Sequence, residues 1–331
     1  MAKIDPATLK PMESVTTDAL PDGDGWQFEP KYDGFRCLAY HRGETVDLRS
    51  RNQRPLGRYF PELAEAISRL EAARFLLDGE IVIPGGSFEL LQLRLHPAAS
   101  RVAKLAAADP ARLIVFDLLE EGRHGLLDRP LAERRVALEA FVARHEGAPG
   151  IALSRATRSA AEARRWLSGM QGLDGIMAKR LDLPYRPGER AMLKFKQWKS
   201  FDCVLGGLYR KAGTGEIETL LFGLYDESGR LDYVGRVPVH GERDEIARKV
   251  QPLVGGSGFT GRSPGGPSRW SRKERRLVPL RPDLVAELSA DHVTGGQMRH
   301  GARLLRWRDD KQPRQCTLDQ LRAAESSPPV A

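Results

Sequence analysis

Short runs of β-branched and apolar residues, each about the length of one strand, recur along the chain and limit the folds open to it. Residues 36–41 and 45–48 flank Arg42-Gly43-Glu44, a pattern that predicts a β-hairpin. Residues 75–83 and 112–119 are further runs of strand length. A chain with many such runs is expected to build its core around sheets.

Helical stretches separate these runs. A helix is expected to begin at Pro61, because proline suits a first helical position. Residues 131–143 and 160–170 are also predicted helices, and Ser159 with Glu162 matches a capping box before the last of them. Strands and helices mixed in this order indicate an α+β fold with antiparallel sheets.

The pattern changes after Lys199. Three strand-like runs with glycine-containing turns follow, at residues 203–209, 218–225 and 231–237, and then a helical stretch. Several short strands with one helix predict a small β-barrel, with the OB-fold as the leading candidate. We therefore expect one domain over residues 1–198, a second over 199–324, and a disordered tail over 325–331.

The charge balance points to a polyanionic partner. Lys and Arg number 52 against 44 Asp and Glu, a net charge of +8. Such a balance favours nucleic acid through counterion release, although an ordinary basic enzyme has the same feature.

Cysteine usage bears on the compartment. The three cysteines are far apart and form no CxxC pair, so a disulfide scaffold or zinc ribbon is not expected. No run approaches the roughly 18 apolar residues of a membrane span. We expect a cytoplasmic monomer without a membrane association.

The motif with the clearest chemical meaning is Lys31-Tyr32-Asp33-Gly34-Phe35-Arg36. A lysine placed where a strand meets a turn projects into a cleft, and the glycine allows the backbone to bend or a ligand to approach closely. Neighbouring cations favour the neutral amine that a lysine nucleophile needs. The alternative is a surface lysine followed by a turn-forming Asp-Gly pair.

Further short motifs follow in order. They are residues 49–52 (Arg-Ser-Arg-Asn), 77–82 (Leu-Asp-Gly-Glu-Ile-Val), 116–119 (Phe-Asp-Leu-Leu), 174–179 (Asp-Gly-Ile-Met-Ala-Lys), 194–196 (Lys-Phe-Lys) and 307–313 (Trp-Arg-Asp-Asp-Lys-Gln-Pro). With this series the chain resembles the covalent nucleotidyltransferase superfamily of ATP-dependent DNA ligases, RNA ligases and mRNA capping enzymes. It is most similar to the small stand-alone bacterial ATP-dependent DNA ligases of the ligase C group.

The resemblance implies a fold and a set of roles. The first domain would be a nucleotidyltransferase (adenylation) domain and the second an OB-fold. Lys31 would attack the α-phosphate of ATP and carry AMP. The other roles would be adenine recognition (Glu29 and Phe116), contact with phosphates (Arg36, Arg51, Lys194 and Lys196), contact with the ribose and a metal (Glu80), and orientation of pyrophosphate (Arg308 and Lys311).

The residue types suit these roles. Two lysines at i and i+2 of a strand point to one face, so Lys194 and Lys196 can reach one phosphate. Glu80 and Asp174 are hard oxygen ligands suited to Mg²⁺ or Mn²⁺. Asp174 stands where such ligases usually have glutamate, and its side chain is one methylene shorter, so its carboxylate reaches less far towards a metal than a glutamate would.

Several of these assignments have a structural alternative. Phe116 would be a core residue, Glu80 an exposed strand residue, and Arg51 a solvated loop cation. Residues 194–196 would be the polar face of an edge strand, and Asp174-Gly175 a plain turn.

Residues 256–263, Gly-Ser-Gly-Phe-Thr-Gly-Arg-Ser, resemble a phosphate-binding P-loop. They follow a helix-like segment rather than a strand, and no helix follows them, so we interpret them as a flexible basic loop.

The leading hypothesis is an ATP-dependent DNA ligase that seals nicks in duplex DNA, acting in repair with partner proteins. One alternative keeps the chemistry but changes the substrate: an RNA ligase, or a capping guanylyltransferase that uses GTP. Another is a nucleic-acid-binding module that has lost catalysis.

Overall fold

The structure, a computed structural model, describes residue 5 and residues 8–72, 74–86, 88–169, 173–196, 198–211, 213–241, 243–265, 276–291, 293–298 and 302–326. The chain divides into two compact units, which meet in sequence between Lys196 and Gln197. Both mix helices with largely antiparallel sheets, so the predicted α+β class is confirmed. The expected tail begins inside the last helix, and residues 327–331 lie outside the described part. No described helix combines the length and apolar character of a membrane span.

The larger sheet of the first unit has the strand order β4-β3-β5-β6-β7, with β8 parallel to β6. Strands β3 and β4 pair as the predicted hairpin. The strands are β3 (Phe35–Arg42), β4 (Thr45–Ser50), β5 (Arg74–Val82), β6 (Arg112–Glu121), β7 (His124–Gly125) and β8 (Ile151–Leu153), and the helices around them are α1 (Pro61–Ser68), α2 (Phe88–Arg94), α3 (Ala99–Ala108) and α4 (Leu131–Arg144).

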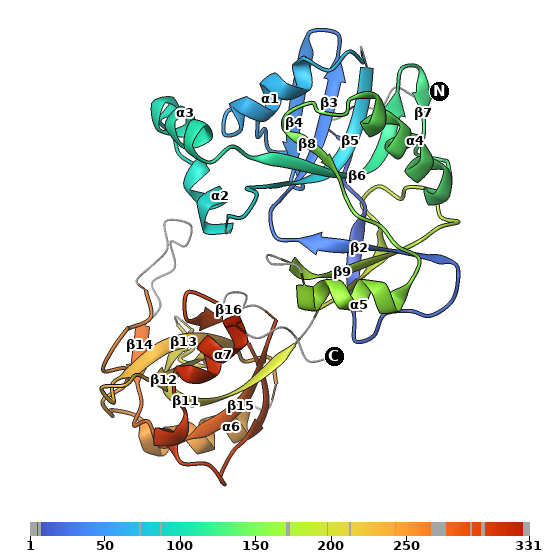
Figure 1. The fold of residues 1–331 in the computed structure, drawn as a ribbon. Helices are drawn as coiled ribbons and strands as arrows, with labels where there is room; N and C mark the ends of the chain where they lie inside the picture. Colours follow the sequence, from blue (N-terminus) through green and yellow to red (C-terminus); the bar gives the residue numbers. More distant parts are fainter. Residues whose placement is uncertain are drawn as a thin grey trace. The chain divides into compact units, whose positions relative to one another are not determined.

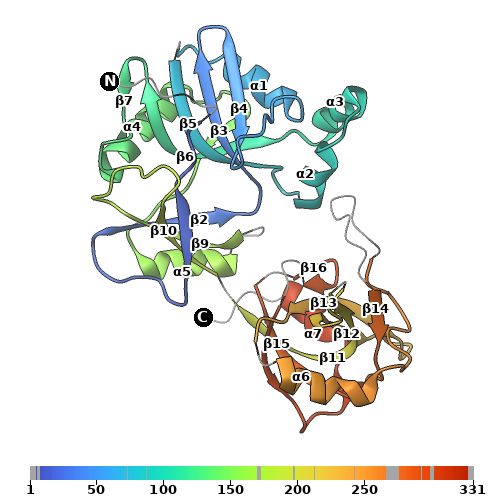
Figure 2. The ribbon, with the colours of Figure 1, turned by 180° about the vertical axis from the view of Figure 1, so that it is seen from behind.

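The smaller sheet of the first unit has the order β1-β10-β9-β2, and β1 runs parallel to β10. Its strands are β1 (Glu13–Thr17), β2 (Trp26–Tyr32), β9 (Leu173–Arg180) and β10 (Arg190–Phe195). Helix α5 (Ala160–Gly169) covers one face, as Figures 1 and 2 show from opposite sides. Its capping residue is the predicted one, because Ser159 Oγ accepts the Glu162 N–H at 3.2 Å.

Helix α5 packs on one face of the sheet that contains β2, and it leaves the opposite face uncovered by this helix. Phe28 of β2 is buried with Trp166 of α5. Side chains alternate along a strand, so Glu29 and Lys31 point to the opposite face of the sheet. The lysine of the motif therefore lies on the face away from α5.

The second unit is an antiparallel sheet with the order β13-β12-β11-β15-β18, in which β14 also pairs with β11. The Ala302 N–H, just before β18, donates to the Arg236 carbonyl of β13 at 2.8 Å, so the two end strands approach each other. Strand pairing in the described residues does not close the predicted barrel. The strands are β11 (Lys199–Arg210), β12 (Ile217–Tyr225), β13 (Leu231–Pro238), β14 (Arg276–Pro279), β15 (Val285–Ala290), β16 (Val293–Thr294), β17 (Gln297–Met298) and β18 (Arg303–Trp307); α6 (Arg243–Val250), η1 (Gln251–Leu253), η2 (Pro313–Gln315) and α7 (Asp319–Ser326) complete the unit.

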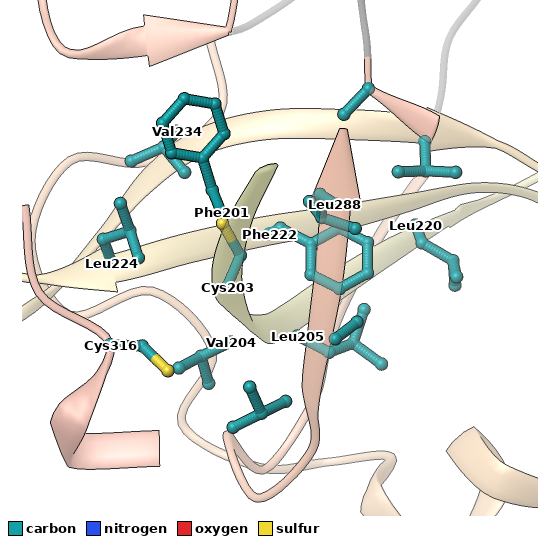
Figure 3. Close-up of a cluster of buried hydrophobic side chains, with 14 of the residues drawn as sticks. Phe201, Cys203, Val204, Leu205, Leu220, Phe222, Leu224, Val234, Leu288 and Cys316 are labelled. Atoms are coloured by element: carbon teal, nitrogen blue, oxygen red, sulfur yellow. The ribbon is translucent and has the colours of Figure 1, made fainter. Parts of the chain in front are cut away.

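The core of this second unit contains two of the three cysteines (Figure 3). Cys203 and Cys316 are buried among apolar side chains such as Phe222 and Leu288, and both are free thiols. Burial raises the pKa of the Cys203 thiol. It therefore behaves as a packing residue rather than as a nucleophile.

Candidate active site

Lys31 lies near the end of β2, opposite Gly175 of β9. Its amine bonds to Asp174 Oδ2, and Lys196 Nζ approaches the same oxygen at 3.1 Å. The Asp174 side chain is 3% exposed, whereas that of Lys31 is 24% exposed. Burial would raise the pKa of Asp174, but the charges of Lys31 and Lys196 outweigh it and lower that pKa. Lys31 would have to leave this ion pair before its amine could act as a nucleophile.

The two motif glycines bring the backbone into close contact at this point. A Cβ on Gly34 would clash with the carbonyl oxygen of Ile81, so the turn from β2 to β3 packs directly on β5. Gly175 has φ +142° and a Cβ there would clash with the Phe195 carbonyl oxygen. The Asp174-Gly175 pair therefore lies in a strand at a point of close strand contact, and the plain-turn alternative is wrong.

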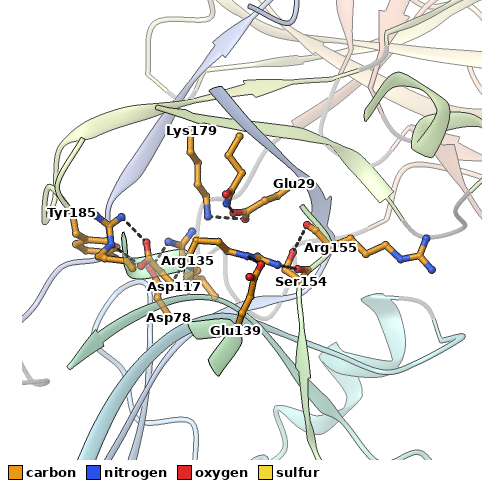
Figure 4. Close-up of polar contacts among 12 residues, drawn as sticks. Glu29, Asp78, Asp117, Arg135, Glu139, Ser154, Arg155, Lys179 and Tyr185 are labelled. Carbon is orange, nitrogen blue, oxygen red and sulfur yellow. Dashed lines mark hydrogen bonds and ion pairs between the residues drawn. The ribbon is translucent and has the colours of Figure 1, made fainter. Parts of the chain in front are cut away.

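Arg36 of β3 is held in one orientation by Asp78 of β5. Its Nε and Nη2 atoms donate to the two carboxylate oxygens, both at 2.6 Å, and its guanidinium lies 4.5 Å from the centroid of the Phe116 ring. Burial would lower the pKa of Arg36, but the charge of Asp78 outweighs it and raises that pKa. The Tyr185 hydroxyl donates to Asp78 at 2.6 Å and accepts the Met12 N–H at 2.9 Å, so Asp78 is itself fixed (Figure 4).

Glu29 forms a buried ion pair two residues before Lys31. Lys179 Nζ donates to Glu29 Oε2 and Gln27 Nε2 donates to Oε1, each at 2.7 Å (Figure 4). Lys179 also lies over the Phe116 ring, 4.3 Å from its centroid. Phe116 is 8% exposed and has two cations against its ring, which distinguishes it from a simple apolar core residue.

Glu80 of β5 is opposite Arg36 in the strand register. In the described part of the chain its carboxylate has no hydrogen-bond or ion-pair partner. Burial raises the pKa of Glu80 to about 7, and the charges of Arg36 and Lys31 offset this only in part. A half-buried carboxylate with no partner among the described residues fits a divalent cation, which would compensate its charge.

Asp174 fits a metal less directly, because both of its oxygens already accept bonds from lysines. Among the described residues there is no group of three or more His, Cys, Asp or Glu side chains arranged around a common point. A cation at this site would therefore need oxygen atoms from elsewhere, such as a phosphate.

Lys194 and Lys196 lie on and just after β10, which is between β1 and β9. The edge-strand alternative is therefore wrong. Lys194 has no hydrogen-bond partner in the described residues. Burial lowers the pKa of Lys194, and the charges of Lys196, Lys31 and Arg51 lower it further. The positive charges of these side chains repel one another, so a bound anion would be stabilised at this site.

Arg51 lies in the loop after β4, and its side chain is 62% exposed. Its Nη2 atom donates to Glu13 Oε1 of β1 at 2.9 Å. This exposure agrees with the solvated-loop alternative, although the charge of Arg51 still reaches Lys194.

Arg308 and Lys311 belong to the second unit, and they share one carboxylate. Asp202 of β11 accepts Arg308 Nη1 at 3.0 Å through Oδ1 and Lys311 Nζ at 2.5 Å through Oδ2. Arg308 also donates two bonds to Asp310, at 2.8 and 2.9 Å.

Sequence reasoning gave no role to Asp78, Lys179, Tyr185 or Asp202. Asp78 and Lys179 belong to the motifs at residues 77–82 and 174–179, so their position in the sequence could have identified them as site residues. Tyr185 and Asp202 carried no such signal, since only the fold brings them to Asp78 and Arg308.

The P-loop-like segment is not a P-loop. It follows η1, and no helix is described between it and β14. The Gly258 N–H donates to the Leu280 carbonyl oxygen, and the Arg262 N–H donates to Asp232 Oδ1. These bonds attach the segment to the rest of the second unit, whereas the sequence predicted a flexible loop.

Two family models match the chain. The ATP dependent DNA ligase domain covers residues 8–196, and the ATP dependent DNA ligase C terminal region covers residues 213–311. The chain belongs to the ATP-dependent DNA ligase family. It is therefore an ATP-dependent enzyme of the DNA ligase class, and the resemblance drawn from its motifs is confirmed.

Individual ligases are similar over nearly the whole chain. DNA ligase C2 of Mycolicibacterium smegmatis is 41% identical, with 97% of this chain and 95% of that protein covered. DNA ligase C of Mycobacterium tuberculosis is 40% identical, with 95% and 93% covered. A solved structure of mycobacterial DNA ligase D in complex with ATP and MES is 27% identical and superposes with a TM-score of 0.51. The match covers 95% of this chain and 99% of that chain.

Proposed function

We propose that this ligase seals nicks between a 5′-phosphate and a 3′-hydroxyl through an AMP carried on Lys31. The Lys31 amine attacks the α-phosphorus of ATP, a P–N bond forms, and pyrophosphate leaves. An oxygen of the 5′-phosphate then attacks the phosphorus of this AMP, so a P–O–P bond forms, the P–N bond breaks and the Lys31 amine is released. Finally the 3′-hydroxyl attacks the 5′-phosphate, a phosphodiester bond forms and AMP leaves. The observation that carries this proposal is the grouping of Lys31, Lys194 and Lys196 around Asp174 on one face of the small sheet.

The adenine would be recognised by Glu29 and Phe116. Lys179 and Gln27 hold both Glu29 oxygens in place, so the carboxylate is ready to accept a bond from an amino group. Phe116 offers an aromatic ring for stacking, and Arg36 and Lys179 lie against that ring.

The phosphates would be held by the cation cluster. Lys194 has no hydrogen-bond partner among the described residues, and Lys196 would exchange its bond to Asp174 for one to a phosphate oxygen, so both can bind the α-phosphate. Arg36 and Arg51 would contact phosphates of the nucleotide or of the nick.

A divalent cation, Mg²⁺ or Mn²⁺, would neutralise charge on the phosphates during transfer. Glu80 would hold it, and Asp174 would contribute once Lys31 has moved away. Arg308 and Lys311 would orient the departing pyrophosphate, which requires the second unit to change its position during the reaction cycle.

The direct test uses ATP labelled at the α-phosphate. Wild-type protein with Mg²⁺ should gain label that survives a denaturing gel, and Lys31→Ala should gain none. Pyrophosphate treatment beforehand removes AMP already bound. If the stripped wild type stays unlabelled, the non-catalytic binding-module alternative replaces this proposal.

Two further measurements separate the substrates. Unlabelled ATP should compete with the label and GTP should not, which distinguishes the ligase from a capping enzyme. Sealing of a nicked DNA duplex, compared with an all-RNA nick, distinguishes it from an RNA ligase.

We further propose that the enzyme acts as a cytoplasmic monomer in DNA repair, together with repair proteins. A deletion strain should then grow normally but be more sensitive to DNA damage. Lethality of the deletion would contradict the repair role.

A further inference from the structure

The cations that the proposed function assigns to pyrophosphate are both organised by one carboxylate. Asp202 is the fourth residue of β11, and its side chain is 14% exposed. Each of its oxygens takes one cation, Arg308 at 3.0 Å and Lys311 at 2.5 Å. Arginine and lysine side chains lose rotamer freedom when they grip an anion, so a carboxylate that fixes them in advance reduces that cost.

Asp202 is in turn fixed by the C-terminal helix. The Asp202 N–H donates to Gln320 Oε1, and Gln320 Nε2 donates back to the Asp202 carbonyl oxygen, each at 3.0 Å. Gln320 belongs to α7, and its neighbour Leu321 is 1% exposed in the core of the second unit. A side chain that satisfies both backbone groups of one residue holds that residue in a single register.

Other charges around Arg308 are arranged in a row across the sheet. Asp202 is opposite Glu287 on β15, and Glu287 is opposite Arg306 on β18. Glu287 bonds to Arg306 at 2.7 Å and lies 3.9 Å from Arg308. Of these two carboxylates, only Asp202 contacts both Arg308 and Lys311 at hydrogen-bond distance, whereas Glu287 bonds to Arg306.

We infer that Asp202, held by Gln320, is a positioning residue that presents Arg308 and Lys311 to the departing pyrophosphate in the first step. The inference rests on the proposed function. It makes α7, which supplies none of the proposed nucleotide contacts, a requirement for transfer of AMP to Lys31. The final sealing step releases no pyrophosphate and does not need this arrangement.

The test compares these two steps in Asp202→Asn and Gln320→Ala. Single-turnover formation of lysyl-AMP should slow by about ten- to a hundred-fold in Asp202→Asn, as expected for loss of charge-assisted bonds, and by a smaller factor in Gln320→Ala. The KM for ATP should change less than the rate. Sealing of a nick whose 5′ end already carries AMP should stay within about two-fold of wild type.

Two further variants keep the result interpretable. Asp202→Glu retains the charge and should recover part of the lost rate. Asp319→Asn removes a carboxylate that is 73% exposed on the same helix and should behave as wild type. Thermal unfolding of every variant should remain cooperative.

Three results would overturn the inference. They are an unchanged rate of lysyl-AMP formation in Asp202→Asn, a faster one, which would make the carboxylate a competitor of the triphosphate, or equal losses in both steps. A wild-type protein that forms no lysyl-AMP would instead refute the proposed function itself.

Discussion

At the scale of single residues, Glu80 is a half-buried carboxylate to which the fold supplies no partner from the described residues. Its pKa of about 7 lies above the ordinary value near 4.5. The folded state therefore binds this proton more tightly than the unfolded chain does. The stabilisation is complete below about pH 4.5 and is lost as the pH rises through about 7.

Glu80→Gln should consequently stabilise the metal-free enzyme at pH 8, by an amount on the order of 3 kcal/mol at most. The gain should shrink towards pH 5, where Glu80 in the folded wild type is protonated. Thermal unfolding at both pH values measures it. Glu65→Gln, at a side chain that is 61% exposed, serves as the control. A Glu80→Gln variant that is less stable than wild type at pH 8 would contradict this account.

The sequence showed which residues were candidates for the site, but it did not show which side chains surround them. The sequence identified Lys31, Glu80 and Lys194 as candidates by their motifs. It could not show that Glu29 is held by Lys179, which is 150 positions away, or that Asp202 is shared by Arg308 and Lys311. Such partners depend on strand pairing between distant segments, and local patterns contain no record of that pairing.

At the scale of elements, the turn from β2 to β3 joins the two sheets of the first unit. Lys31 is the second-last residue of β2 and Arg36 the second residue of β3, so the turn sets the spacing between the candidate nucleophile and the Arg36–Asp78 pair. The turn can approach β5 because Gly34 has no side chain.

Gly34→Ala should therefore destabilise the fold by about 1–3 kcal/mol and slow the formation of lysyl-AMP, because a methyl group would push the turn away from the Ile81 carbonyl. Denaturant unfolding and the labelling assay measure the two effects. Gly25→Ala is the matched control, since nothing lies within 4 Å of a Cβ there. Equal behaviour of the two variants would show that the close approach is unimportant.

The strands themselves could be predicted, and their arrangement could not. Runs such as residues 75–83 correspond to β5, and the hairpin of β3 and β4 is confirmed. The parallel pairing of β1 with β10, and the strand order of the second unit, whose described residues do not pair into a closed barrel, have no local signature. Both follow from contacts across long stretches of chain.

At the scale of the whole molecule, the two units have separate cores. Among the described residues, each buried apolar cluster lies within one unit: one cluster contains residues from 201 onwards, and the other three contain residues before 196. Residues 1–196 alone should therefore fold and unfold cooperatively.

This fragment should nevertheless form lysyl-AMP at least about a hundred-fold more slowly than the full chain, because Arg308 and Lys311 are missing. Circular dichroism on heating and single-turnover labelling measure the two properties. A folded fragment that takes up AMP at the full rate would contradict the role proposed for these cations.

The pairing of β2 has a consequence for how this protein is made. In the described residues β2 takes its place in a sheet only against β9, and β1 only against β10. Lys31 therefore leaves the ribosome long before the strands that carry Asp174, Lys194 and Lys196 exist. Its surroundings are completed only when synthesis has passed residue 196, so a chain that stops earlier contains the candidate nucleophile but lacks the aspartate and lysines that surround it in the folded protein.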